Sequence, residues 1–279
     1  MNAKNQQRFV PPTEQEGDHG PLEGAGVADL VQRMHRADRA AWEAVGRALP
    51  EVTAVIEVLE ARMRDGGRLF YLGAGTSGRL GVVDASECPP TFGVEPGRVV
   101  GLIAGGDGAI RTAVEGAEDD PRGAWRDLEA FRPDPARDTV VGIAASGRTP
   151  YVVGGIEAAR AHGLHTVAVV CNPDSAAAAA AHQAIEVVTG PEFVTGSTRL
   201  NAGTATKHVL NLLTTVTFIR LGHVKGSRMI DMRPSNSKLV DRGIRMIQEW
   251  SDLSDEDAAA LLEQTGSVRA ALETLKRPD

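Results

Sequence analysis

Two hydroxyl-rich loops give this chain a clear means of binding an anion. The first loop follows the apolar run Leu69–Leu72 and reads Gly73-Ala74-Gly75-Thr76-Ser77-Gly78-Arg79. The second follows Val140–Ile143 and reads Ala144-Ala145-Ser146-Gly147-Arg148-Thr149. Such turns surround an anion with backbone N–H groups and hydroxyls at a helix N-terminus, where the helix dipole favours negative charge. Two of them in one chain predict a phosphorylated ligand held between them.

Two acidic segments could transfer protons beside such a ligand. Glu87 lies near the end of the helix predicted after the first loop, where the helix dipole disfavours a carboxylate. Glu115 and Glu118 lie within Ala113–Asp120, just after the second predicted strand. The ordinary alternative is a solvated glutamate at a helix end or on a helix surface, and spacing alone does not reject it.

Other chemistries fit the motifs less well. The first loop matches the Gly-x-Gly-x-x-Gly dinucleotide fingerprint, but the acidic residue that should hold the ribose is missing at the expected distance. Asp107 comes too late, behind a proline-rich insertion. The chain has no Gly-Lys-Ser/Thr phosphate loop, no Gly-x-Ser-x-Gly elbow and no clustered His/Cys spacing. We therefore expect no cofactor and no metal.

Composition describes an ordinary globular protein with an acidic balance. The 279 residues are 42% hydrophobic and 24% charged, with a net charge of −7. This charge argues against a nucleic-acid partner, although local dipoles and a few arginines can still bind a small anion. No apolar stretch approaches the ~18 residues of a membrane span. Cys88 and Cys171 lack metal spacing and are expected to be reduced thiols, so the expected location is the cytoplasm.

The order of elements predicts an α/β fold with a doubly wound, five-stranded parallel sheet. Helical patterns separate most of the short apolar runs, which is typical of parallel strands covered on both faces. A strand order of 2-1-3-4-5 would place the two loops at one switch point, where ligands bind. The expected strands are Leu69–Leu72, Val99–Ala104, Val140–Ala144, Thr166–Cys171 and Ile185–Val188.

Four segments are expected along the chain. Residues 1–26 should form a mobile arm and residues 27–66 two helices, the first with Leu30, Val31, Met34, Trp42 and Val45 on one face. Residues 67–226 should form the sheet domain. Residues 227–279 should form a small C-terminal helical module.

Four stretches resemble the N-acetylmuramic acid 6-phosphate etherases, which are built on the sugar-isomerase (SIS) fold. The sequences Ser86–Gly93 and Ala113–Asp119 separate this resemblance from SIS domains in general. Together the stretches cover most of the central domain: residues 71–93, 101–120, 140–153 and 190–207.

The resemblance implies a lyase that cleaves the ether between N-acetylglucosamine 6-phosphate and D-lactate in recycled cell-wall sugar. It implies Glu87 as the acid and Glu118 as its partner base, although the sequence does not decide which glutamate has which role. The residues that it places around the substrate are Thr76, Ser77, Ser146, Gly147, Arg148, Thr149, Ser197 and Lys207.

This chemistry explains why two carboxyl groups are needed. In the open-chain sugar, the C1 aldehyde makes the C2 proton acidic, and one carboxylate can remove it. A protonated carboxyl donates to the lactyl oxygen at C3, lactate leaves, and water adds to the unsaturated aldehyde. Each positioned proton transfer contributes typically ~10²–10⁴-fold. A carboxyl that is protonated at neutral pH requires burial or a neighbouring carboxylate.

Helix geometry raises the question of a second subunit. Ser77 and Glu87 would lie ~15 Å apart along a continuous helix, which exceeds the length of a hexose. Either the helix bends back, or Glu87 serves the phosphate loop of a partner. The favoured expectation is a homodimer with shared active sites.

Departures from the family pattern keep alternatives open. Asn201 stands where the family usually has Lys, the arm after Thr13-Glu14 is unusual, and the C-terminal module is shorter than usual. The first two differences leave a shifted substrate open as an alternative. A non-catalytic sugar-phosphate sensor like the glucokinase regulatory proteins needs the loops but not both glutamates. An aldose–ketose isomerase would lack the Ser86–Gly93 sequence, and a DNA-binding regulator would need a basic helix-turn-helix.

Overall fold

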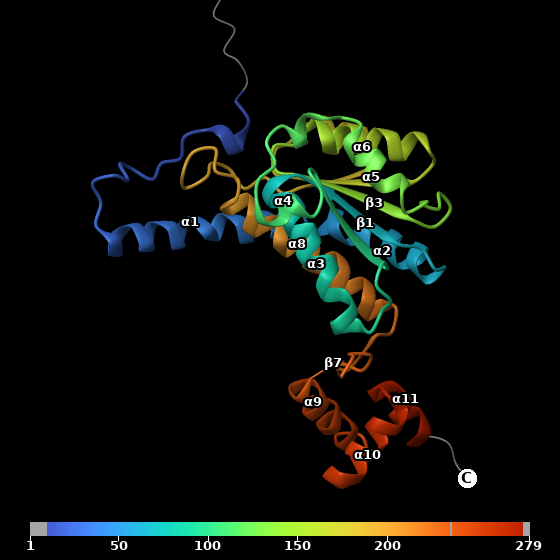
Figure 1. The fold of residues 1–279 in the computed structure, drawn as a ribbon. Helices are drawn as coiled ribbons and strands as arrows, with labels where there is room; N and C mark the ends of the chain where they lie inside the picture. Colours follow the sequence, from blue (N-terminus) through green and yellow to red (C-terminus); the bar gives the residue numbers. More distant parts are fainter. Residues whose placement is uncertain (1–9, 235, 276–279) are drawn as a thin grey trace, which may run out of the picture.

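The computed structural model describes residues 10–234 and 236–275, and its centre is a five-stranded parallel sheet (Figure 1). The strand order is β2-β1-β3-β4-β5, as the sequence predicted. Strand ends differ from the predicted ones by at most a few residues. The strands are β1 (Leu69–Gly73), β2 (Val99–Ile103), β3 (Thr139–Ala144), β4 (His165–Val170) and β5 (Gln183–Glu186).

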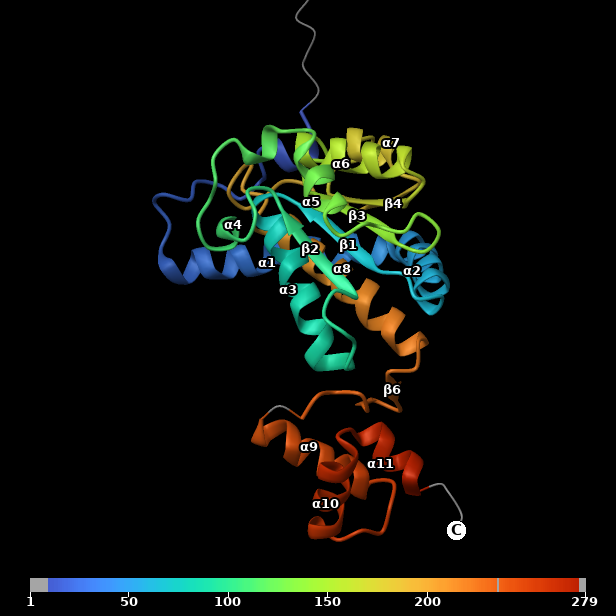
Figure 2. The same cartoon turned by 45° about the vertical axis from the view of Figure 1, so that its right-hand side comes forward.

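Helices cover both faces of this sheet, each face with its own apolar cluster. One face is covered by the longer helices, with α5 to α7 on the opposite side (Figure 2). The long helices are α1 (Val27–Arg47), α2 (Leu49–Arg64), α3 (Gly75–Phe92) and α8 (Asn201–Arg220). The helices of the other face are α5 (Gly123–Glu129), α6 (Pro150–Ala161) and α7 (Ala176–Ala180). Because strands β1, β3 and β4 are covered on both sides, their sequences are nearly continuous apolar runs.

Helix α1 corrects one expectation about its packing. The predicted apolar face does not pack as a unit, because Val45 is buried whereas Val31 and Trp42 are 62% and 69% exposed. Ala41 and Ala44 pack beside Val45 instead. Figure 1 shows α1 extending beyond the sheet domain, so its first turns lack core to cover them.

The C-terminal segment folds around an apolar cluster of its own. The segment is mainly helical, as expected, and Gly226 turns the chain at φ 59° between two short antiparallel strands that precede the helices. An ion pair between Arg269 and Asp231 joins α11 to the chain that follows β7. The elements are β6 (Val224–Lys225), β7 (Arg228–Met229), α9 (Ser237–Gln248), α10 (Asp255–Thr265) and α11 (Val268–Leu275).

Short helices complete the chain. The arm contains a 3-10 helix, η1 (Pro12–Glu14), and the connection after β2 contains α4 (Gly108–Arg111) and η2 (Ala117–Asp119). Among the described helices, none is both long enough and apolar enough to span a membrane.

Candidate active site

The two hydroxyl-rich loops begin side by side at the carboxyl edge of the sheet. Strands β1 and β3 are direct neighbours, and Gly73 at the end of β1 pairs with Ile143 near the end of β3. The connection from β1 crosses on the α3 face, whereas the connection from β3 crosses on the α6 face. The loops therefore open at the switch point that the predicted strand order requires.

Close packing explains the glycines of the first loop. A Cβ atom on Gly73 would lie 2.6 Å from the Gly78 nitrogen, and one on Gly78 would lie 2.6 Å from Ile103 Cγ1. Gly75 has φ 52°, which favours glycine. The resemblance to a dinucleotide fingerprint thus reflects tight contact between strand and helix. Thr76 and Ser77 follow within the first turn of α3, both half-buried.

The second loop is held by its own tight turn. Gly147 has φ 67°, and a Cβ atom there would lie 2.3 Å from the Ser175 side chain. The Ser146 hydroxyl accepts a hydrogen bond of 3.2 Å from the Arg148 backbone N–H. Arg148 is exposed, and Thr149 is the residue just before α6. The turn and the start of α6 therefore bring together three predicted substrate residues, Ser146, Arg148 and Thr149.

Of the N-termini of α3, α6 and α8, which lie near this edge, two are open. Within the described chain, no side chain caps α3 or α6. The N-terminus of α8 is occupied by buried Glu192, whose carboxylate accepts hydrogen bonds from Asn201 N (2.7 Å) and Ala202 N (3.0 Å). Burial raises the pKa of Glu192, and these two N–H bonds oppose that shift. Anion binding by backbone N–H groups is therefore left to α3 and α6.

Glu192 and Asn201 form a structural pair that the sequence does not indicate. Asn201 is buried, and its side-chain amide donates to the Pro191 carbonyl at 3.4 Å. The side chain is thus directed into its own loop. No local pattern indicates this cap, because Glu192 lies nine residues before Asn201 in the sequence.

The turn before α8 lies against the first loop. A Cβ atom on Gly203 would lie 3.6 Å from both Thr76 Cγ2 and the Thr198 carbonyl oxygen. Ser197, half-buried, precedes Thr198 in this turn. Lys207 is exposed further along α8, and its charge weakly opposes the rise that burial causes in the pKa of Asp84 on α3. Both predicted substrate residues of this region therefore lie on elements that border the first loop.

A cavity of about 200 Å³ joins the first loop to the acidic segment after β2. Its walls include Gly75 together with Glu115 and Glu118, and both glutamates are exposed. Arg79 holds α4, which directly precedes this segment, because its guanidinium donates to the carbonyls of Ala109 (2.8 Å) and Ile110 (2.9 Å). No pattern in the sequence indicated that role, because these contacts exist only once α3 and α4 are placed together.

Glu87 lies outside this cavity. Helix α3 is unbroken from Gly75 to Phe92, so Glu87 lies ~15 Å from Ser77 along the axis. The alternative that the helix bends back is wrong. Glu87 is exposed, and it is not among the residues that line the cavity with Glu118. A single chain brings Glu118 to the first loop and leaves Glu87 apart from it.

Asp84 forms a buried polar centre between α3 and α8. Its carboxylate accepts hydrogen bonds from the Tyr71 hydroxyl (2.9 Å), the Asn211 amide (2.8 Å) and the Thr214 hydroxyl (3.2 Å). Burial raises the pKa of Asp84, while the three donors lower it. These hydrogen bonds join α3 to α8. They therefore help to set the position of Glu87, which lies on α3, relative to α8.

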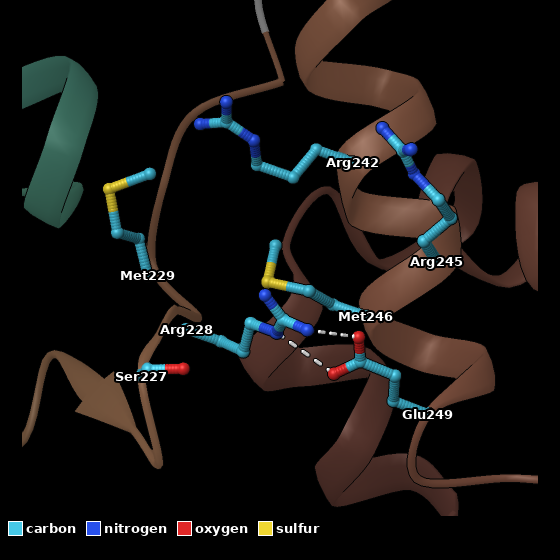
Figure 3. Close-up of a pocket in the computed structure, with 7 residues that line it drawn as sticks. All are labelled: Ser227, Arg228, Met229, Arg242, Arg245, Met246 and Glu249. Carbon is cyan, nitrogen blue, oxygen red and sulfur yellow. Dashed lines mark hydrogen bonds and ion pairs between the residues drawn. The ribbon is translucent and has the colours of Figure 1, made fainter.

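A larger hollow lies away from both loops. It has a volume of about 560 Å³ and lies between β7 and α9 in the C-terminal segment (Figure 3). Arg228 pairs there with Glu249, with a hydrogen bond of 2.9 Å between Nε and Oε2. Its lining includes none of the residues predicted to bind substrate or transfer protons.

Comparisons with known proteins agree with this architecture. Residues 51–160 match the family model described as the glucokinase regulatory protein N-terminal SIS domain. The chain is 52% identical over 276 residues to an N-acetylmuramic acid 6-phosphate etherase from Christiangramia forsetii, covering 99% of this chain and 98% of that one. It is 54% identical over 245 residues to the etherase of Streptomyces coelicolor, covering 88% and 78%.

Solved structures show the same fold at low sequence identity. A phosphoheptose isomerase from Francisella tularensis has a TM-score of 0.53 and 15% identity, covering 68% of this chain and 99% of that one. A protein from E. coli has a TM-score of 0.52 and 16% identity, covering 73% and 97%. These similarities confirm the SIS-type sheet and carry no argument about the reaction.

Proposed function

Because this chain belongs to the N-acetylmuramic acid 6-phosphate etherases, we propose that it cleaves N-acetylmuramic acid 6-phosphate to N-acetylglucosamine 6-phosphate and D-lactate. High identity over nearly the whole length of a curated relative supports this lyase activity in cell-wall sugar recycling. The structural observation that carries the proposal is the cavity that joins Gly75 of the first loop to Glu118. The two buried free cysteines, Cys88 and Cys171, are consistent with the cytoplasmic location that we propose.

The two loops hold the phosphate end of the sugar in this proposal. The open N-termini of α3 and α6 provide N–H groups, and hydroxyls and Arg148 add further donors. The residues assigned to substrate are Thr76, Ser77, Ser146, Gly147, Arg148, Thr149, Ser197 and Lys207.

The two glutamates transfer protons at the other end of the sugar. Glu118 removes the C2 proton of the open-chain form, and Glu87 protonates the lactyl oxygen as the C3–O bond breaks. Water then adds at C3 of the unsaturated aldehyde to restore the sugar. The assignment of base and acid follows the family resemblance. These residues act by general acid–base catalysis, so the proposed steps use this chain's own side chains.

A homodimer supplies the missing glutamate. Glu87 of one subunit serves the loop and Glu118 of its partner, because the unbroken α3 keeps the two glutamates of one chain apart. Helix α1 offers a surface for such contact, since its apolar side chains Val27, Val31 and Trp42 are exposed.

The decisive experiment is incubation with N-acetylmuramic acid 6-phosphate, followed by measurement of D-lactate. We expect lactate release in step with N-acetylglucosamine 6-phosphate, and deuterium at C2 when the reaction runs in D₂O. Binding of the sugar phosphate without lactate release would instead support a sensor of the glucokinase-regulator type. Release of lactate without deuterium at C2 would reject the elimination route.

A further inference from the structure

We propose that Thr13 of the N-terminal arm is a positioning residue for the second phosphate loop, and that it acts through Asn172. The proposal rests on the proposed function, because it assigns that loop to phosphate. It extends the active site to a segment that sequence patterns suggest is a mobile arm.

A reciprocal pair of hydrogen bonds joins the arm to the sheet. The Thr13 backbone N–H donates to Asn172 Oδ1 at 3.1 Å, and Asn172 Nδ2 donates to Thr13 Oγ1 at 2.8 Å. Thr13 is fully buried and Asn172 is 2% exposed. Hydrogen bonds between buried groups are costly to break, because each group left alone loses its partner without regaining water. The arm is therefore fixed at Thr13 and not merely laid on the surface.

Asn172 also touches the loop itself. Its Nδ2 donates to the Ala145 carbonyl at 3.1 Å, and the Cys171 backbone N–H donates to that same carbonyl at 3.0 Å. Ala145 directly precedes Ser146 and Gly147. One amide group thus orients both the arm and the peptide from which the phosphate-binding turn starts.

The arm continues along the other border of the site. The Glu14 carboxylate lies 3.1 Å from where a Cβ atom of Gly196 would be, beside Ser197. The rings of His19 and Phe193 have centroids 5.1 Å apart. The arm therefore contacts the connection from β5 to α8 as well as the second loop, so its docking and the shape of the site are coupled.

The test compares Thr13→Val, which keeps the side-chain volume but loses the hydroxyl, with Thr13→Ser, which keeps the hydroxyl. Glu16→Ala is the matched control, since Glu16 is exposed on the same arm. We expect Thr13→Val to raise KM and the inhibition constant of inorganic phosphate together, by about three- to tenfold, with kcat nearly unchanged. Thr13→Ser and Glu16→Ala should behave as wild type. Equal KM and phosphate inhibition in Thr13→Val and wild type would overturn the proposal.

Hydrogen exchange of the wild-type protein provides a test that needs no variant. Coupling is reciprocal, so inorganic phosphate should slow exchange at residues 10–16 as well as at residues 145–149. Protection at 145–149 alone would overturn the role of Thr13 and leave the etherase proposal standing. Protection of both segments in a protein without etherase activity would reject the proposed function while keeping the coupling. Absence of protection at 145–149 would overturn the assignment of this loop to phosphate and, with it, the role of Thr13.

Discussion

Ser77 and Glu87 stand on one unbroken helix, ~15 Å apart along its axis. Ser77 lies at the loop end of α3, while Glu87 is exposed near its far end. A sugar phosphate held at Ser77 therefore cannot reach Glu87 of the same chain without a large change in α3. This separation makes the dimeric site the most informative feature to test.

Mixing two inactive variants tests the shared site. Glu87→Gln and Glu118→Gln subunits, unfolded and refolded together, should regain about a quarter of wild-type activity. Half of the random dimers are mixed, and each mixed dimer has one site with both wild-type glutamates. The measurement is lactate release, with each variant refolded alone as the control. Absence of recovery, despite mixed dimers shown by mass spectrometry with one variant labelled with 15N, would place both glutamates in one chain.

Each glutamate alone should be essential for turnover. We expect Glu87→Gln and Glu118→Gln to lower kcat by ~10²–10⁴-fold each, because a positioned proton transfer is lost. Inhibition by inorganic phosphate measures the loops separately and should change little. Glu115→Gln is the control, since Glu115 lines the same cavity. If Glu115→Gln were inactive and Glu118→Gln active, the base would be Glu115.

Arg79 should control the rate through the position of Glu118. Arg79→Ala removes both hydrogen bonds to the carbonyls of Ala109 and Ile110. A displaced catalytic group is costly, and we expect kcat to fall by ~10²-fold. Arg79→Lys should recover only part of this, because an ammonium cannot reproduce the planar fork. A rise in KM with normal kcat would show instead that Arg79 acts on substrate binding.

The close contact of β1 with α3 should make Gly78 intolerant of a methyl group. In Gly78→Ala the new Cβ would lie 2.6 Å from Ile103 Cγ1 and 2.8 Å from the Gly73 carbonyl oxygen. We expect the free energy of unfolding to fall by about 1–3 kcal/mol, measured in urea. Gly46→Ala is the control, because a Cβ there meets nothing within 4 Å in helix α1. It should be neutral or slightly stabilising. Equal losses in both variants would contradict the packing argument.

Asp84 should make stability depend on pH in a defined direction. Burial raises its pKa in the folded state. The stabilisation of the folded state that results from this pKa difference is fully present below the unfolded pKa of about 3.9. It is lost as the pH rises through the pKa of Asp84 in the folded protein. The difference in unfolding free energy between wild type and Asp84→Asn should favour wild type more at pH 4 than at pH 7. Urea unfolding at the two pH values measures it, and the opposite trend would contradict a raised pKa.

The sequence by itself determined the sheet and the place of its loops. Apolar runs such as Val140–Ala144 must be covered on both faces, and their alternation with helices leaves a parallel sheet. The loops at Gly73 and Ala144 then meet at the switch point because β1 and β3 pair. Side-chain type and local period are enough for these conclusions, since both act over short stretches of chain.

Only the tertiary structure decided which distant groups touch. The cap of Glu192 on α8, the hold of Arg79 on α4 and the bond of Thr13 to Asn172 join residues that no local pattern relates. The exposure of Trp42 likewise depends on which side of α1 faces the core, since its helix neighbours Ala41, Ala44 and Val45 are buried. Periodicity shows that a face is apolar, but burial depends on whether another element lies opposite it.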